Sequence, residues 1–452
     1  MNNKITFSSY LAIGFMLFAL FFGAGNLIFP AQLGQYAGSN IWPAIIGFLV
    51  TGVGLPLLGI LAMGFSGSRN LQELSSRVHP VYGIFFTALL YLTIGPFFAA
   101  PRTGTVAYEV GIAPFISEGA QQTGLLVFTI LFFAVALLFS LYPGKIVNNV
   151  GKILAPALVV LLVILLLVAI FNPMGAMQNP QEAYQGGAFV TGFLEGYNTM
   201  DALASLVFGI IVINAIRALG ITSKSGILSA TARTGVIAIT LLGIIYVGIA
   251  ILGATSTETL GLFDTGGPVL SGAASHYFGT FGSIMLAIMI ILACLTTAIG
   301  LITAKAEYFN TLFPNLSYKV VVVVFSVLTF VVANFGLANI ITFSIPVLMF
   351  LYPLAIVLML LTFVSPLFNH ARMVYVAAIA VTFLISIFDG LVALCDSLGI
   401  DNFSWMNPVL NFYESVLPFY NQGLGWLLPA AIVIIITGII AKVVNVGSTQ
   451  EV

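Results

Sequence analysis

Two short stretches of this chain place flexible or polar residues where an apolar run would otherwise continue. The first stretch, Gly23-Ala24-Gly25-Asn26, interrupts a run that resumes from Leu27 to Pro30. Glycine and asparagine tolerate non-helical backbone, and unwound backbone at membrane depth occurs only where it lines a protected cavity. A helix that restarts after such a break presents unpaired N–H groups and a positive dipole end, which favour a carboxylate. The stretch therefore predicts one half of a binding site.

The second stretch, from Glu195 to Asp201, is a polar island inside another apolar run. Carboxylates are among the costliest groups at bilayer depth, so both acids are candidate functional residues. Half-helices that end near Phe22 and Glu195 would leave carbonyl groups free to accept hydrogen bonds from an ammonium group or to coordinate a cation. The two stretches together suit a zwitterion such as an amino acid. Its side chain is expected to be apolar, because the neighbouring residues are Phe21, Phe22, Leu27, Met200 and Leu203.

Two adjacent hydroxyl groups, those of Thr296 and Thr297, lie in a third apolar run. Such hydroxyls often donate to a carbonyl of their own helix four residues earlier. Together with carbonyls freed at the first stretch, their oxygens could also bind a small hard cation such as Na⁺, which is held by oxygen ligands. The sequence leaves both interpretations open.

The composition indicates which elements must position these residues. Of the 452 residues, 60% are hydrophobic and only 6% are charged, whereas soluble domains have about 25% charged residues. The solidly apolar runs predict an all-α polytopic membrane protein, because the strands of a membrane barrel would alternate over ~10 residues. Cys294 and Cys395 both fall in apolar runs, so no disulfide framework is expected.

Twelve apolar windows approach the ~20-residue length of a transmembrane helix. They cover residues 9–34, 41–65, 81–110, 123–142, 152–171, 190–215, 230–254, 277–303, 318–334, 338–364, 373–394 and 423–443. With a cytoplasmic N-terminus, all but Arg102 of the 13 Lys and Arg residues fall on the cytoplasmic side, Lys305 among them. We therefore expect a single transmembrane domain over residues 1–452, with both termini in the cytoplasm.

The two polar interruptions fall in the first and sixth windows. Transporters built from inverted repeats place discontinuous helices at corresponding positions of their two halves. We expect a five-plus-five inverted repeat, the first half over residues 9–171 and the second over 190–364, with helices eleven and twelve (373–443) as additions. The outer segment from Thr255 to His276 is expected to be either a lid over the outer mouth or a solvated loop.

Arg102, next to Pro101 in the third window, is the basic residue expected at membrane depth. An intramembrane arginine should face a cavity or pair with an acid. Glu109, Glu195 and Asp201 are the candidate partners, and direct contact with a substrate is the alternative. An enzyme is not expected, since no His/Asp/Glu metal cluster or Ser-His pair falls at membrane depth.

The stretches from Gly23 to Pro30, from Pro101 to Thr105 and from Glu195 to Asp201 resemble the branched-chain amino acid:cation symporter family of bacteria, over essentially the whole chain. That family is similar to the leucine-transporter-like superfamily, so the resemblance implies alternating access in the bacterial cytoplasmic membrane. The chain departs from neurotransmitter-type relatives because it lacks an Arg between Asn26 and Pro30, and their outer charged gate is therefore not assumed.

The resemblance also implies roles for individual residues. The substrate would be bound by Phe22, Gly23, Ala24, Gly25, Asn26, Glu195, Gly196, Tyr197 and Asn198. Sodium would be held by the carbonyls of Ala19 and Phe22 together with Ala293, Thr296 and Thr297, where Ala-x-x-Thr-Thr fits the family pattern Ala-x-x-Thr-Ser. Arg102, Glu109 and Asp201 are possible gate or coupling residues. The implied function is sodium-coupled uptake of leucine, isoleucine and valine, and the alternative is proton coupling through Glu195 or Asp201.

Overall fold

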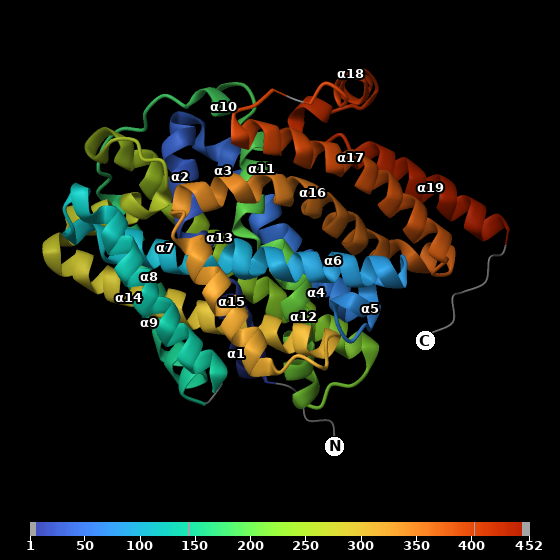
Figure 1. The fold of residues 1–452 in the computed structure, drawn as a ribbon, viewed down its shortest axis with the longest axis horizontal. Helices are drawn as coiled ribbons and strands as arrows, with labels where there is room; N and C mark the ends of the chain where they lie inside the picture. The colour runs from blue at the N-terminus through green and yellow to red at the C-terminus, as the bar shows by residue number, and fades with distance from the viewer. Residues whose placement is uncertain (1–5, 143–144, 402, 445–452) are drawn as a thin grey trace.

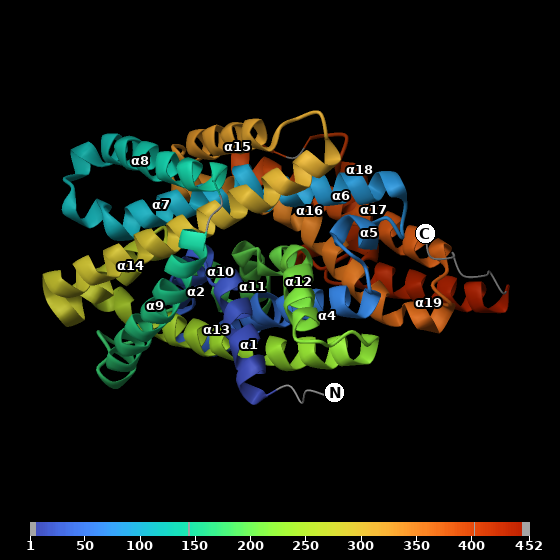
Figure 2. The same ribbon diagram turned by 90° about the horizontal axis from the view of Figure 1, so that it is seen from below.

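The computed structural model describes residues 6–142, 145–401 and 403–444, with the backbone alone for 145–155. Within these ranges the chain forms helices, turns and connecting segments and contains no β-strand, which confirms the all-helical prediction. Figure 1 shows long helices that cross at varied angles, with α17 (Arg372–Leu398) and α19 (Leu427–Val443) side by side at one end, an arrangement that Figure 2 repeats from below. Other long helices include α8 (Gln121–Leu141), α9 (Lys145–Phe171), α13 (Lys224–Leu260), α14 (Gly266–Leu312), α15 (Tyr318–Ala333) and α16 (Leu337–Val364).

Every predicted window contains a helix. Eight helical stretches of the described residues are long and apolar enough to cross a membrane, and four further apolar helices are shorter. The membrane class is therefore supported by length and composition. The twelve-span count and the inverted repeat stay predictions.

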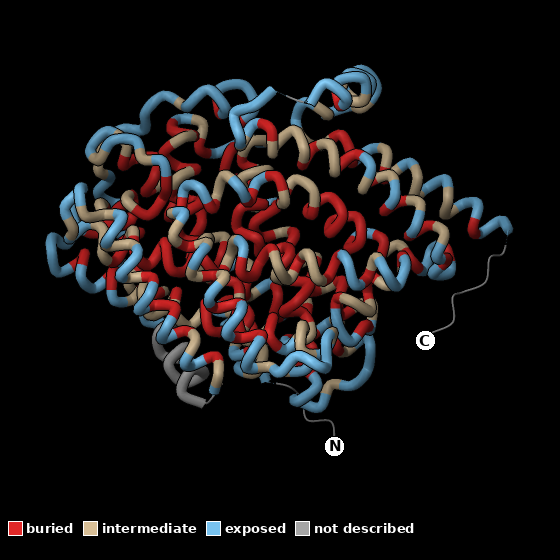
Figure 3. Tube along the Cα trace, viewed as in Figure 1, coloured by how far each residue is buried: buried red, intermediate tan, exposed pale blue. Residues whose placement is uncertain are grey.

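Burial separates the central helices from the peripheral ones. In Figure 3 the buried trace runs through the middle of the molecule, and the exposed trace lies at its edges. The most apolar window of the stretch that contains α16 is 67% buried, whereas that of the stretch that contains α8 is 28% buried. Large apolar side chains of α8, such as Leu131 and Leu138, are exposed. Such a surface is suited to lipid, so α16 belongs to the core and α8 to the rim.

The two predicted breaks are present. The first break, Phe22 and Gly23, separates α1 (Phe7–Phe21) from α2 (Ala24–Ala37). The second break, from Gly196 to Met200, separates α11 (Ala188–Glu195) from α12 (Asp201–Ala218). Its first four residues form the 3₁₀ turn η6 (Gly196–Thr199), and Met200 has φ 60°, in the left-handed region. Such a conformation is rare for a residue with a side chain and interrupts the right-handed helix.

A third break was not predicted. The window over residues 81–110 was expected to be one continuous helix, which is wrong: α6 (Pro80–Leu92) and α7 (Ala99–Gly111) are separated by the π-type turn η3 (Thr93–Phe97) and by Phe98. We call Thr93 to Phe98 the third break. Gly95 has the non-helical angles φ −89° and ψ −132°, and it precedes Pro96. Proline removes a backbone donor and clashes with the preceding turn, and a Gly-Pro pair was a readable signal for this interruption.

Two other expectations need correction. Helix α14 extends beyond the predicted window 277–303, so Lys305 lies inside a helix with 1% exposure rather than at a loop. The segment from Thr255 to His276 is not a solvated loop, because α13 continues to Leu260 and α14 begins at Gly266. Gly266 packs on α2 so closely that a Cβ there would lie 1.9 Å from the carbonyl oxygen of Ile28.

Helices α11 and α3 (Ile41–Leu49) touch through glycines on both sides. A Cβ on Gly192 would lie 1.9 Å from the carbonyl oxygen of Ala44, and a Cβ on Gly47 would lie 1.9 Å from that of Phe189. The obstruction is backbone in both cases and cannot rotate away. These glycines therefore fix how the half-helix before the second break is held.

We expect Gly192→Ala to lower the midpoint of thermal unfolding in detergent, because the added methyl group forces two helix backbones apart, at a cost of about 1–3 kcal/mol. The matched control is Gly300→Ala in α14, where a Cβ would meet nothing within 4 Å. Alanine favours the helix over glycine by ~1 kcal/mol, so the control should be as stable as the native chain or more so. Equal midpoints for the two variants would contradict the packing argument.

Candidate functional site

The first break has two chemically different ends. The N–H of Phe22 donates to the carbonyl of Phe18 at 2.8 Å and closes the end of α1. The N–H of Gly23 donates to Oδ1 of Asn26 at 2.8 Å, so a side chain replaces the lost helical acceptor. The N–H groups in the first turn of α2 have no carbonyl ahead of them within the helix. They point a positive dipole end toward the break.

Asn26 joins the first break to the second. Its Nδ2 donates to Oδ2 of Asp201, the first residue of α12, at 2.5 Å and also to the hydroxyl of Tyr246 in α13. The Tyr246 hydroxyl donates to the same Asp201 oxygen at 2.9 Å. All three side chains are buried. The structure thus unites two predicted site residues, Asn26 and Asp201, and adds Tyr246, which sequence reasoning missed.

This network changes the role expected of Asn26. Both ends of its amide are engaged, because Oδ1 accepts a hydrogen bond from the N–H of Gly23 and Nδ2 donates one to Asp201. Its side chain therefore fixes the geometry between the breaks, while the backbone of Gly23 to Asn26 is the part that can face a ligand. Asp201 lies at a helix N-terminus, where the dipole stabilises negative charge. Within the described ranges the ion pair that the structure shows is Arg69 with Glu73 at 3.2 Å, so Asp201 has no basic partner.

Arg102 pairs with no acid among the described residues, and the predicted partners Glu109, Glu195 and Asp201 are wrong. Its Nη1 donates to the carbonyl of Asn198 in the second break at 2.6 Å, and its Nη2 donates to the hydroxyl of Ser344 in α16 at 3.1 Å. The guanidinium also lies 4.9 Å from the ring centre of Phe29 in α2. With 2% exposure, it holds three helices together around the second break.

The remaining acids of the predicted site lie in less central positions. Glu195 is half-buried and accepts a hydrogen bond from Nδ2 of Asn198 at 2.8 Å. Glu109, also half-buried, accepts from the hydroxyl of Thr265 at 2.7 Å and so holds the segment that precedes α14. Neither forms an ion pair with Arg102. Tyr197 stacks on Tyr352 of α16, with ring centres 4.0 Å apart.

The two threonines of α14 bond to their own helix. The hydroxyls of Thr296 and Thr297 donate to the carbonyl of Ala293 at 2.9 and 3.0 Å. A hydroxyl that donates one hydrogen bond keeps lone pairs for a further partner, so this bonding does not remove the oxygens as cation ligands. Thr297 lies beside the first break, since a Cβ on Gly23 would be 3.5 Å from its methyl carbon. The described residues contain no group of three His, Cys, Asp or Glu side chains that could hold a metal ion.

Two buried charged residues were missed by sequence reasoning. Asp389 in α17 is 8% exposed, and its Oδ2 has no hydrogen-bond partner in the described part of the chain. Lys305 is also buried, and its Nζ has no hydrogen-bond partner in the described part of the chain. Asp389 lies in the apolar window 373–394, and the criterion that selected Glu195 and Asp201 would have selected it too.

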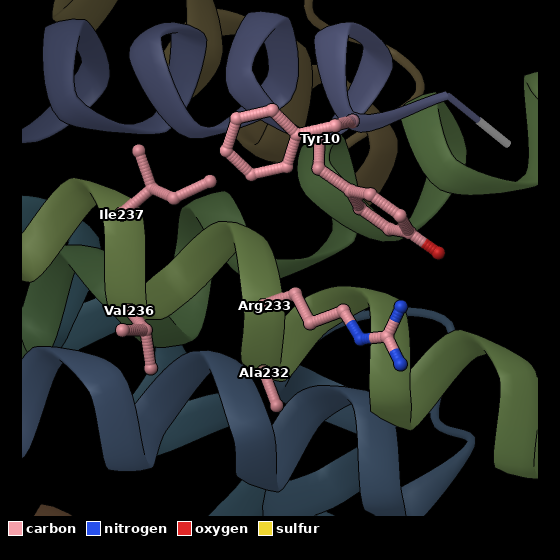
Figure 4. A pocket seen from close by; sticks show the side chains of 6 residues that line it. Tyr10, Ala232, Arg233, Val236 and Ile237 are labelled. Carbon is pink, nitrogen blue, oxygen red and sulfur yellow. The ribbon is translucent and has the colours of Figure 1, made fainter.

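A groove between two helices is separate from the breaks. It has a volume of about 570 Å³ and lies between α1 and α13. Its lining consists of Phe7, Tyr10, Ala232, Arg233, Val236 and Ile237. Figure 4 shows Arg233 below Tyr10, and the guanidinium lies 5.4 Å from the ring centre. No residue predicted to bind substrate or sodium lines this groove.

The fold is that of a known class of membrane transporter. Over 96% of this chain and 91% of the other, the structure is similar to that of Mhp1 in an inward-facing conformation, with a TM-score of 0.61 and 16% identity. It is also similar to that of MhsT, solved in complex with L-phenylalanine, with a TM-score of 0.56 and 15% identity over 96% and 98% of the two chains. Both have the leucine-transporter-like fold, which confirms that part of the resemblance.

The family can also be named. The chain matches the model of the branched-chain amino acid transport protein family over residues 6–444, and it belongs to that family. It is 50% identical to the branched-chain amino acid permease BrnQ of Bacillus subtilis, over 95% of this chain and 96% of the relative. It is 38% identical to the BrnQ permease of Escherichia coli K12, over 96% of each chain. The family consists of transporters rather than enzymes.

We expect Tyr246→Phe to lower the midpoint of thermal unfolding, since it removes a hydrogen bond to a carboxylate and leaves Asp201 less satisfied, at a cost of about 1.5–3 kcal/mol. Tyr197→Phe is the matched control. The Tyr197 hydroxyl is buried without a partner in the described ranges, so its removal should leave stability unchanged or raise it. If the thermal midpoint of Tyr197→Phe falls as far as that of Tyr246→Phe, the Asp201 network does not stabilise the fold.

Proposed function

We propose that this protein takes up branched-chain amino acids by sodium-coupled symport with alternating access. The observation that carries the proposal is the direct connection of two broken helices through Asn26, Asp201 and Tyr246. Broken helices at corresponding positions are where transporters of this architecture bind substrate and ions. The family description and the names of the BrnQ permeases support leucine, isoleucine and valine as the substrate class.

The breaks offer complementary ends for a zwitterion. The N–H groups at the start of α2 suit the carboxylate, and carbonyls at the end of α11 and in η6 suit the ammonium group. Phe22, Gly23 to Asn26 and Glu195 to Asn198 remain the proposed substrate-binding residues. Arg102 and Asp201 are engaged elsewhere, because Arg102 donates to Asn198 and Ser344, and Asp201 accepts from Asn26 and Tyr246.

Sodium, as the co-transported ion, fits the other end of the first break. The carbonyls of Ala19, in the last turn of α1, and of Phe22, directly after it, lack helical donors. Thr297 lies against Gly23, and Thr296 and Ala293 lie within one turn of it in α14. Neutral oxygen ligands of this kind suit a hard monovalent cation. Coupling would follow from the shared backbone, since the same few residues would hold ion and substrate.

A second candidate is proton coupling. Asp201 is 3% exposed with no basic partner in the described residues, and Glu195 is half-buried with an amide as its partner. An intramembrane acid without a counter-charge is a typical proton carrier. We place the transporter in the bacterial cytoplasmic membrane because its BrnQ relatives are bacterial. The Lys and Arg distribution supports cytoplasmic termini.

Uptake by proteoliposomes decides between the two coupling ions. We expect accumulation of radiolabelled leucine to require an inward sodium gradient and to be competed by isoleucine and valine. In sodium-free buffer with an inward proton gradient, uptake should remain at the background of empty liposomes. Undiminished uptake without sodium would exclude sodium coupling, and an absence of leucine uptake under every gradient would exclude the substrate class.

Thr297→Ala tests the sodium ligands. We expect it to raise the sodium concentration for half-maximal uptake roughly tenfold, as the loss of a ligand worth ~1.4 kcal/mol would do, while expression stays unchanged. Thr240→Ala is the matched control, because the Thr240 hydroxyl bonds its own helix at the carbonyl of Val236 and lies on an exposed face of α13. A Thr297→Ala variant with the sodium dependence of the control would remove α14 from the cation site.

A further inference from the structure

Lys305 is a buried lysine for which neither the fold nor the proposed transport cycle has yet given a role. It is 1% exposed, and its Nζ has no hydrogen-bond partner in the described part of the chain. An ammonium group away from water is expensive unless other groups compensate its charge. Ionisable residues in such positions are usually retained for function.

The side chain of Lys305 lies in a notch that a glycine provides. A Cβ on Gly95 would lie 2.8 Å from Cδ, 2.9 Å from Cε and 3.2 Å from Nζ of Lys305. No other residue type therefore fits at position 95 while the lysine holds this position. One turn away on each helix, Tyr91 stacks on Tyr308 with ring centres 4.4 Å apart, which fixes the register between α6 and α14.

Gly95 belongs to the third break, and this break has the polarity that a cation satisfies. Helix α6 ends there, and the carbonyl groups of a last turn carry the negative end of the helix dipole. Pro96 supplies no N–H to the preceding turn, which leaves one carbonyl without its helical donor. Nζ of Lys305 thus lies at the carbonyl end of a broken helix, in the field of its dipole, and donates a hydrogen bond to no carbonyl of the described residues.

The third break also sets where Arg102 lies. Helix α7 starts at Ala99, directly after this break, and Arg102 is in its first turn. From there Arg102 reaches the carbonyl of Asn198 in the second break at 2.6 Å. A change in the angle between α6 and α7 would therefore move the guanidinium away from the second break.

We propose that Lys305 is a positioning residue for transport, a tethered cation that holds the third break in the bent form that places Arg102 on the second break. The inference rests on the proposed function, because the second break is the proposed substrate site. Lys305 acts through α7 and does not itself touch substrate. Its charge, and not only its bulk in the Gly95 notch, is required.

The test compares variants that separate charge from packing. Lys305→Met keeps a chain of similar length without the charge, and Lys305→Arg keeps the charge. We expect Lys305→Met to raise the apparent KM for leucine uptake in proteoliposomes roughly tenfold, in line with loss of a charge at a helix terminus, and Lys305→Arg to restore most of the loss. Lys319→Met, at an exposed lysine in the first turn of α15, is the matched control and should keep the native KM.

A double variant tests the packing explanation. Gly95→Ala combined with Lys305→Ala returns one methyl group to the notch without the charge. We expect this pair to remain impaired, whereas recovery of native uptake would show that bulk alone matters and would overturn the proposal. A Lys305→Met protein with native KM would overturn it as well. Where Lys305→Met does not fold, Lys305→Gln replaces it with the same two outcomes.

The native chain provides the separate check on function. If native proteoliposomes take up no leucine, the proposed function fails, and the role of Lys305 is then read from the geometry alone. A fluorescent label on the native Cys294 could not then report the angle between α6 and α7, because this thiol is buried. The thermal midpoint of Lys305→Met against Lys305→Arg serves instead, and equal midpoints would overturn a charge-dependent role at the third break.

Discussion

The constraint on which this structure depends is that a broken helix inside an apolar core must find partners for its freed backbone groups. Each unpaired group would cost several kcal/mol in hydrocarbon. The first break meets this demand with the Asn26 side chain, which accepts from the N–H of Gly23. The second meets it with Arg102, which donates to the carbonyl of Asn198. Because the second of these side chains comes from another helix, breaking a helix also determines which helices must stay together.

The location of the first two breaks could be predicted from the sequence, whereas their connections could not. Both breaks have local signals that can be recognised without tertiary information. These are glycines and an asparagine within one apolar run and two acids within another. The contact of Asn26 with Asp201 joins residues 175 positions apart, and that of Asn26 with Tyr246 joins residues 220 apart. Tyr246 is one tyrosine in a long apolar helix, and nothing in its surroundings distinguishes it from a core residue. The third break was readable from Gly95-Pro96 and was missed because the window was judged by hydropathy alone.

The wrong partners expected for Arg102 show where sequence reasoning about charge fails. The expectation treated opposite formal charge as the available compensation. Inside this fold a fixed carbonyl dipole, a hydroxyl group and the face of Phe29 provide it together. A carbonyl released by a break carries only a partial negative charge, but it is already fixed in place, whereas a side-chain carboxylate must first be desolvated. Acids elsewhere, such as Glu109 with Thr265, are then free to brace peripheral segments.

The unequal support of the two halves of the first broken helix indicates which half is free to move. Helix α2 is held by Asn26 to α12 and α13, by Arg102 over Phe29, and by Gly34, where a Cβ would lie 2.0 Å from the carbonyl of Ala250. Helix α1 packs on α13 around Gly14, where a Cβ would lie 2.7 Å from a side-chain carbon of Ile237, and beyond that contact the open groove begins. Under the proposed symport, closure and opening on the α1 side would therefore turn about Phe22 and Gly23. An ion held by α1 carbonyls and Thr297 would be the contact that resists this motion.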